Sequence, residues 1–180
     1  VVGDMQGALL RSLILALIVM VITALFSTML AMAFRKRFFG SNVLFYTVMS
    51  GLMVPGILLS LGLATLMREV GIPAAWWSSA LGVHVVWTLP FGFLVMMAVF
   101  NRFDVSLEDA ARDIGADECT VFKEVTFPLI LPGRVAAGLF GFSLSYAEFA
   151  RTTFVPFLTH IYRFRRRPGF VDTWRIMLST

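Results

Sequence analysis

The sequence contains few charged residues and few of the residues that carry enzyme chemistry. Only 14% of its 180 residues are charged, and it has one cysteine and two histidines. Typical soluble domains contain about 25% charged residues. A single cysteine excludes an internal disulfide. The sequence also lacks a GxxxxGK[ST] phosphate loop, a dinucleotide fingerprint, a catalytic triad and a cluster of metal ligands, so we expect neither an ATPase nor any other enzyme, and no cofactor.

Apolar residues make up 58% of the chain, and the mean hydropathy is +0.84. A chain of this size cannot bury so much apolar surface in water, whereas a lipid bilayer accepts it. Lipid offers the backbone no hydrogen bonds, and the strict alternation of a barrel strand is missing, so the spans should be helices. The sequence therefore predicts an all-α, polytopic transmembrane helical bundle. The four apolar stretches long enough to span are residues 9–34, 43–67, 78–100 and 135–158.

Proline and glycine interrupt these stretches. Pro55 and Gly56 lie within the second stretch and Pro90 within the third, and each proline should kink its helix because it removes a hydrogen bond. Glycines allow helices to pack closely, and in a transporter they also suit a hinge. The glycines concerned are Gly51, Gly56, Gly62, Gly92, Gly138 and Gly141.

Basic residues predict the orientation in the membrane. Arg35, Lys36 and Arg37 follow the first stretch, and further basic residues lie between the third and fourth. The positive-inside rule places both connections in the cytoplasm. The second connection, with Trp76 and Trp77, then lies outside, where paired tryptophans suit the membrane interface. We therefore expect a multi-pass membrane protein.

Residues 101–132 form a polar insert between the third and fourth stretches, with seven acidic residues between Asp104 and Glu124. Ser106 is expected to cap a helix, and Asp109, three residues later, to complete a capping box. Gly115 stands where a left-handed glycine ends a helix. Two interpretations remain open at this point: a solvated hairpin that only links two spans, or a docking surface for a partner.

A second short helix is expected to follow the glycine. Asp117 can cap it at its start, and it should run through Lys123. Pro128 and Pro132 are expected to stop it before the fourth span. The insert thus predicts a helix, a glycine turn and a second helix.

The insert resembles the EAA motif of bacterial ABC importer permeases. That motif reads Glu-Ala-Ala, three residues, Gly, nine residues, Ile, one residue, Leu-Pro. The spacing is matched by Asp109, Ala110, Ala111, Gly115 and Pro128. Three departures are visible: Asp109 replaces Glu, although Glu108 is adjacent, and Val125 and Phe127 replace Ile and Leu.

The resemblance covers about residues 8–155, and it is greatest to the spermidine/putrescine-type permeases. The strings that suggest this are MVPGILLSLGL, WTLPFGFLVM and GFSLSYAEFARTTFV. Related permeases for iron, thiamine, sulfate and other solutes share the scaffold. The resemblance implies a MetI-like permease domain over residues 1–155, located in the bacterial inner membrane, with a polyamine as the solute.

The same resemblance implies the partners. A periplasmic solute-binding protein would deliver the solute, and two permease subunits, identical or different, would form the path. Two cytoplasmic ATP-binding subunits would supply the energy. No nucleic acid would be involved. The coupling residues would be Glu108, Asp109, Ala110, Ala111, Gly115 and Pro128. When the ATPase closes, this insert would move with it and tilt the spans.

An ionisable residue inside a span is costly and tends to face a cavity or a partner. Glu148 is therefore a candidate for the lining of a path for cations, to which Tyr146 could add a hydroxyl or a cation–π face. His84 and Trp87 of the third stretch are further candidates for the lining. Alternatively, Glu148 pairs with Arg151 three residues later on the same helical face. For His84, packing is the simpler role.

Two other classes of protein remain open: a fragment of a secondary transporter or channel, and a membrane scaffold that uses the insert for docking.

The tail, residues 156–180, departs from the family pattern and carries a basic cluster at residues 163–167, which the positive-inside rule disfavours outside. We expect a missing last helix, through truncation or a shifted reading frame near residue 155, and a further helix before the first. The isolated chain should then assemble poorly with its ATPase.

Overall fold

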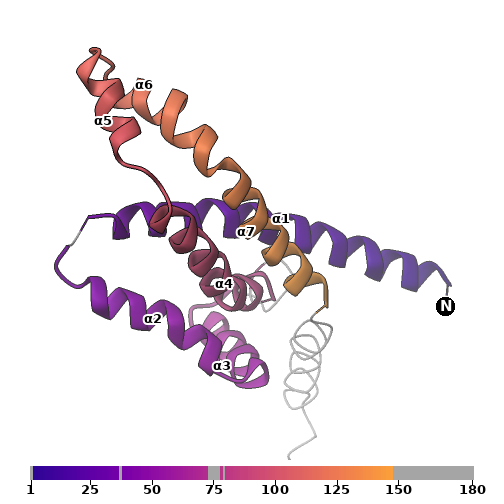
Figure 1. Ribbon diagram of the computed structural model, residues 1–180. Coiled ribbons are helices and arrows are strands. Elements are labelled where there is room, and N and C mark those ends of the chain that lie inside the picture. The colour runs from indigo at the N-terminus through magenta and orange to yellow at the C-terminus, as the bar shows by residue number, and fades with distance from the viewer. Residues whose placement is uncertain (1, 37, 73–77, 79, 148–180) are drawn as a thin grey trace, which may run out of the picture. The chain divides into compact units, whose positions relative to one another are not determined.

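The computed structural model describes residues 2–36, 38–72, 78 and 80–147, and all regular structure in these ranges is helical (Figure 1). The all-α prediction is confirmed for this part of the chain. In chain order the elements are α1 (Val2–Phe34), α2 (Ser41–Met53), α3 (Gly56–Glu69), α4 (Leu81–Asn101), α5 (Ser106–Asp113), α6 (Glu118–Thr120), the π-helical segment η2 (Val121–Thr126) and α7 (Phe127–Ala147).

Three helical segments are long and apolar enough to cross a membrane: Leu10–Phe34, Leu81–Asn101 and Glu118–Ala147. A fourth results if α2 and α3 together count as one broken span. Apolar side chains of α1 such as Leu17, Phe26 and Met29 remain about half exposed or more, which suits contact with lipid rather than with water. These helices support a polytopic membrane protein.

The prolines act differently in the two middle spans. Residues 54 and 55 interrupt the second one, because Pro55 has no N–H and disfavours the α conformation at the residue before it. Pro90, in contrast, lies inside an unbroken α4. The fourth apolar helix also begins well before residue 135, since α7 starts at Phe127 and continues the helix of the insert.

The described residues fall into two compact units. The first comprises residues 2–53 and 84–147, and the second comprises residues 54–83. In the second unit Ser60 and Ala64 of α3 are buried, and the Ser60 hydroxyl donates to the carbonyl of Gly56 at 2.8 Å. A Cβ added at Gly82 would lie 2.6 Å from the Leu63 side chain, so a glycine allows this contact.

In the first unit, α1, α4 and α7 meet at Thr23. Its hydroxyl lies 2.8 Å from that of Thr88, which pairs two polar groups that lipid would leave unsatisfied. Gly92 of α4 and Gly141 of α7 approach the same threonine: an added Cβ would lie 2.7 Å from Thr23 Cγ2 and 2.9 Å from Thr23 Cβ, respectively. The absence of side chains at both positions permits this close packing.

Nearer the insert, an aromatic cluster fixes the end of α1. The ring of Phe34 lies 5.1 Å from that of Phe93 on α4, and Phe45 of α2 lies 6.1 Å from Phe93. Both contacts have the edge-to-face geometry that aromatic pairs favour. Met96 and Ile130 are fully buried in the same core. The last turn of α1 is therefore held firmly, and this fixes the position of Arg35, the residue that follows α1.

Candidate functional site

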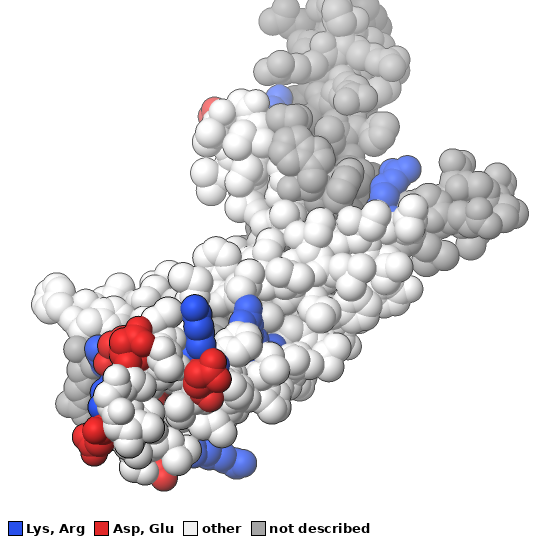
Figure 2. All heavy atoms as spheres, turned by 90° about the horizontal axis from the view of Figure 1, so that it is seen from above, with Lys and Arg blue, Asp and Glu red and all other residues white. Residues whose placement is uncertain are grey.

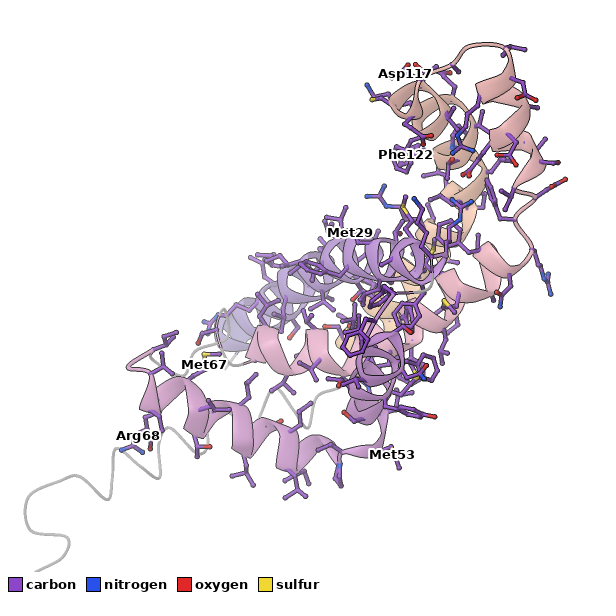
Figure 3. All side chains as sticks on the ribbon, turned by 90° about the vertical axis from the view of Figure 1, so that its left-hand side faces the viewer. Met29, Met53, Met67, Arg68, Asp117 and Phe122 are labelled. Carbon is purple, nitrogen blue, oxygen red and sulfur yellow. The ribbon has the colours of Figure 1, made fainter. Side chains whose placement is uncertain are left out.

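The polar insert, which in the structure comprises residues 102–126 between α4 and α7, carries most of the charge in the described part of the chain. Figure 2 shows acidic and basic side chains gathered over the α5 and α6 end, whereas the rest of the described surface in this view is mostly uncharged. Asp117 and Phe122 belong to this end, beyond Met29 of α1 (Figure 3). The insert is thus a hydrophilic projection from apolar helices.

Asp104, and not the predicted Ser106, supplies the side-chain acceptor at the start of the first helix of the insert. Ser106 is already the first residue of α5, and its N–H donates to Asp104 Oδ1 at 3.0 Å. The Ser106 hydroxyl and this N–H lower the pKa of Asp104, because both stabilise the charged carboxylate. The predicted Ser106–Asp109 capping box is therefore wrong: an acidic residue two positions earlier supplies the acceptor.

Gly115 ends α5 as predicted. Its φ is +95°, in the left-handed region that favours glycine. The Gly115 N–H donates to the carbonyl of Arg112 at 2.9 Å, and the Ala116 N–H donates to that of Ala111 at 3.1 Å. These two bonds form a Schellman motif, which satisfies the last carbonyls of the helix and reverses the chain sharply.

The second helix does not stop at the prolines. Asp117 caps α6 by accepting from the N–H of Cys119, and the helix then passes through η2 directly into α7. The Phe127 N–H bonds the carbonyl of Phe122, five residues back, so the turn widens immediately before Pro128, which has no N–H to donate. The prediction that Pro128 and Pro132 end this helix is wrong; both lie in α7.

A partly buried ion pair ties the insert to the end of α1. Arg35, the first residue after α1, donates from Nη1 to Glu108 Oε1 at 2.9 Å and from Nη2 to Glu108 Oε2 at 2.8 Å. The Thr126 hydroxyl donates to the same carboxylate at 2.6 Å. Glu108 therefore joins three segments: the end of α1, α5, and the last residue of η2.

The surroundings strengthen this pair. Glu108 is 5% exposed, and the Arg35 guanidinium lies over the rings of Phe103 (4.9 Å) and Phe100 (5.4 Å). Planar stacking and a two-pronged hydrogen bond are both specific to arginine. Because the Glu108 carboxylate is buried, removal of Arg35 would leave its charge without this partner.

The pKa of Glu108 is lowered from the ordinary glutamate value, mainly by the hydrogen bonds from Arg35 and against the opposing effect of burial. A lowered pKa in the folded state means that the stabilisation is fully present above the usual glutamate pKa. It is lost only when the pH falls through the lower, folded-state pKa. The ion pair therefore remains intact throughout the neutral range.

Arg112 connects the two helices of the insert across the Gly115 turn. Its Nε donates to Glu118 Oε1 at 2.8 Å, and its Nη1 donates to Asp109 Oδ1 at 2.9 Å. The hydrogen bonds that Arg112 donates to Glu118 raise the pKa of Arg112 and lower the pKa of Glu118. Exposed pairs of this kind stabilise a protein little individually, but this set holds the hairpin in one geometry.

A hollow of about 580 Å³ opens beside the ion pair, between the end of α1 and the insert. Its lining combines charged groups, such as Lys36 and Glu118, with apolar ones, such as Met32 and Phe122. The outer surface of α5 also mixes the two kinds of residue: Leu107 is 45% exposed and Ile114 is 87% exposed. Exposed apolar side chains within a charged projection are typical of an interaction surface.

The predicted coupling residues are placed as follows. Asp109, Ala110, Gly115 and Pro128 are exposed and Ala111 is half-buried, whereas the Glu108 carboxylate points inward to Arg35. The sequence interpretation missed the role of Arg35, because 73 residues separate it from Glu108.

The residues predicted to line a path lie elsewhere. His84 is buried on α4, and Trp87 on the same helix meets the ring of Phe91 edge-on at 5.7 Å. Tyr146, near the end of α7, is half exposed and stacks on Phe142. Glu148, Arg151 and the whole of the tail lie outside the described residues. Within residues 2–36, 38–72, 78 and 80–147, no cluster of His, Cys, Asp and Glu could hold a metal ion.

Comparisons with known proteins give consistent results. The chain is 32% identical over 122 residues to the spermidine/putrescine transport system permease protein PotC of Haemophilus influenzae. The matched region covers 68% of this chain and 47% of that protein. The putrescine transport system permease protein PotI of Escherichia coli K12 is 28% identical over 159 residues, or 84% of this chain and 56% of that protein. The molybdenum transport system permease protein ModB of H. influenzae is 28% identical over 134 residues, or 67% of this chain and 58% of that protein. No family model matches the chain.

These similarities, together with the apolar helices and the insert between them, define a class: the chain resembles the permease subunits of ABC importers. Within that class it resembles the spermidine/putrescine type, which confirms the resemblance predicted from the sequence motifs. The chain spans about half the length of the curated relatives it matches.

Proposed function

We propose that this chain is part of the membrane-spanning permease subunit of an ABC importer in the bacterial inner membrane. The observation that supports this most strongly is the polar insert. It is a short, capped helical hairpin with an exposed apolar surface, it sits between two apolar helices, and it carries the spacing of the EAA motif. Cytoplasmic ATP-binding subunits, a second permease subunit and a periplasmic solute-binding protein would complete the system.

The mechanism follows from the connections of the insert. The surface around Asp109, Ala110 and Ile114 would fit a groove on the ATPase, and closure of the ATPase dimer would move the hairpin. Because the insert is continuous with α4 and α7, its movement would tilt these two helices as rigid bodies and change which side of the path is open. The Schellman turn and the contacts of Arg112 support a hairpin that moves without deforming.

The proposed solute is a polyamine, as in the names of PotC and PotI. Glu148 would attract a cationic solute to the path, and Tyr146 would contribute a hydroxyl or the face of its ring. His84 and Trp87 would lie farther along, on α4. A molybdenum transport system permease is also among the relatives, so the choice of a polyamine rests on PotC and PotI and not on the scaffold.

The complete gene product should support ATP-driven uptake. In proteoliposomes that hold its ATPase and second permease, with the binding protein outside, labelled spermidine should accumulate only when ATP is hydrolysed. Uptake that follows an ion gradient without ATP would identify a secondary transporter instead. Absence of uptake for polyamines and for other solutes, with the ATPase still bound, would leave a scaffold role.

The insert should face the cytoplasm. The structure places the native Cys119 on its surface, where it is exposed. A membrane-impermeant thiol reagent should leave Cys119 unlabelled in intact cells and label it after permeabilisation. In a Cys119→Ser background, a cysteine at Ala75, in the connection expected outside, should react in intact cells. Labelling of Cys119 from outside would reverse the orientation and overturn the proposed coupling role.

A further inference from the structure

The insert has a third attachment besides its two chain connections. The backbone joins it to α4 and α7, and the Arg35–Glu108 pair joins it to the end of α1. The pair is two-pronged, which fixes orientation as well as distance. Because Thr126 bonds the same carboxylate, the attachment also includes the segment that leads into α7.

We infer that Arg35 and Glu108 are positioning residues that make α1 move together with the insert. This inference rests on the proposed function. The docking surface and the ion pair lie on different sides of α5: Asp109 and Ala110 are exposed, whereas Glu108 is buried. Glu108 thus transmits force within the permease rather than contacting the ATPase.

The packing of the first unit indicates that the pair does more than hold α1 in place. Helix α1 already packs along α7, around Thr23 and the glycines, and its last turn is held by Phe34 against Phe93. What the ion pair adds is a fixed position of the hairpin relative to α1. Without it, the hairpin would keep its chain connections to α4 and α7, but it could pivot on residues 102–105 and on the widened turn of η2.

A pivoting hairpin would uncouple two events. The ATPase would still bind the outer surface of α5 and close on ATP, but part of the motion would be lost in the insert instead of reaching all three helices. ATP would then be hydrolysed with little solute moved. Loss of a simple stabilising contact would instead lower docking, hydrolysis and transport together.

The first test measures solute moved per ATP hydrolysed by the complete transporter in proteoliposomes. Arg35→Gln should lower this ratio about fivefold or more, in the range of typical coupling effects, while the ATPase still copurifies and hydrolyses ATP. Arg35→Lys, which keeps the charge but loses the two-pronged geometry, should give an intermediate ratio. The matched control is Lys36→Gln, which removes the neighbouring positive charge and should leave the ratio unchanged. An unchanged ratio for Arg35→Gln, or an equal fall for Lys36→Gln, would overturn the inference.

The second test needs no transport. Spin labels on cysteines introduced at Lys36 and Lys123, in the Cys119→Ser background, report the distance between the end of α1 and the insert in the membrane. The distribution should be narrow, should broaden in Glu108→Gln, and should stay narrow in the control Glu124→Gln, an exposed acid of the same insert. Equal distributions for Glu108→Gln and its parent would overturn the inference. If the distance distribution broadens in Glu108→Gln but the parent transporter shows no ATP-driven uptake, the proposed function is rejected. The attachment of the insert to α1 is then retained.

Discussion

Replacing Gly141 by leucine should disrupt the meeting point of α1, α4 and α7 and cause a large loss of stability. A Cβ at this position would lie 2.9 Å from Thr23 Cβ, an atom bonded directly to the α1 backbone. The helices must therefore separate, since no flexible side chain can yield. Separation would also break the Thr23–Thr88 hydrogen bond. Overpacking of this kind costs about 1–3 kcal/mol.

Thermal unfolding in detergent, followed by size-exclusion chromatography with fluorescence detection, measures this effect. Gly62→Leu is the matched control, because it is the same change within a helix and a Cβ at Gly62 meets nothing within 4 Å. The control should unfold close to the temperature of the parent, whereas Gly141→Leu should unfold well below it. Equal midpoints for the two variants would show that the close packing at Thr23 does not stabilise the protein.

Replacing Gly115 by valine should abolish most transport while leaving membrane insertion intact. With φ at +95°, a β-branched residue is strained by about 1–2 kcal/mol or more, and the Schellman turn should open. The hairpin would then lose the bond between Arg112 and Glu118 that spans the turn. Binding weakened by about 1.4 kcal/mol corresponds to a tenfold loss of affinity, so we expect about a tenfold fall in ATPase docking.

Copurification of the ATPase with the permease provides the measurement. Gly115→Asn is the control, because asparagine tolerates the left-handed region and should retain most docking. Asp109→Lys should reproduce the defect of Gly115→Val by a different route, since it reverses a charge on the exposed side of α5. Normal docking and transport in both Gly115→Val and Asp109→Lys would remove the coupling role from this hairpin.

The parts of the structure that depend on nearby residues were predictable from the sequence. Apolar runs of about 20 residues predicted membrane helices because the bilayer thickness sets that length. Gly115 predicted a helix end because few other residues adopt a positive φ without strain. The broken second span followed from Pro55 for an equally local reason.

Other features depend on competition between local alternatives or on distant contacts. Asp104 and Ser106 can both cap a helix, and the pattern alone favoured the wrong one. Pro128 was expected to end a helix, but the turn before it widens to a π-turn and the helix continues. The pairing of Arg35 with Glu108 depends on how α1 crosses the bundle, and no spacing within the sequence carries that information.

The widened turn of η2 also sets the rotational phase between the hairpin and α7. Each residue of an α-helix turns its successor by about 100° and advances it by about 1.5 Å. A deletion in the regular part of α7, where no widened turn can absorb it, would rotate everything before it by about that angle relative to the rest of α7. Glu108 would then point away from Arg35, and the exposed side of α5 would face a new direction. The continuous helix from η2 into α7, with its widened turn, thus fixes the directions of the inner and outer contacts of the hairpin together.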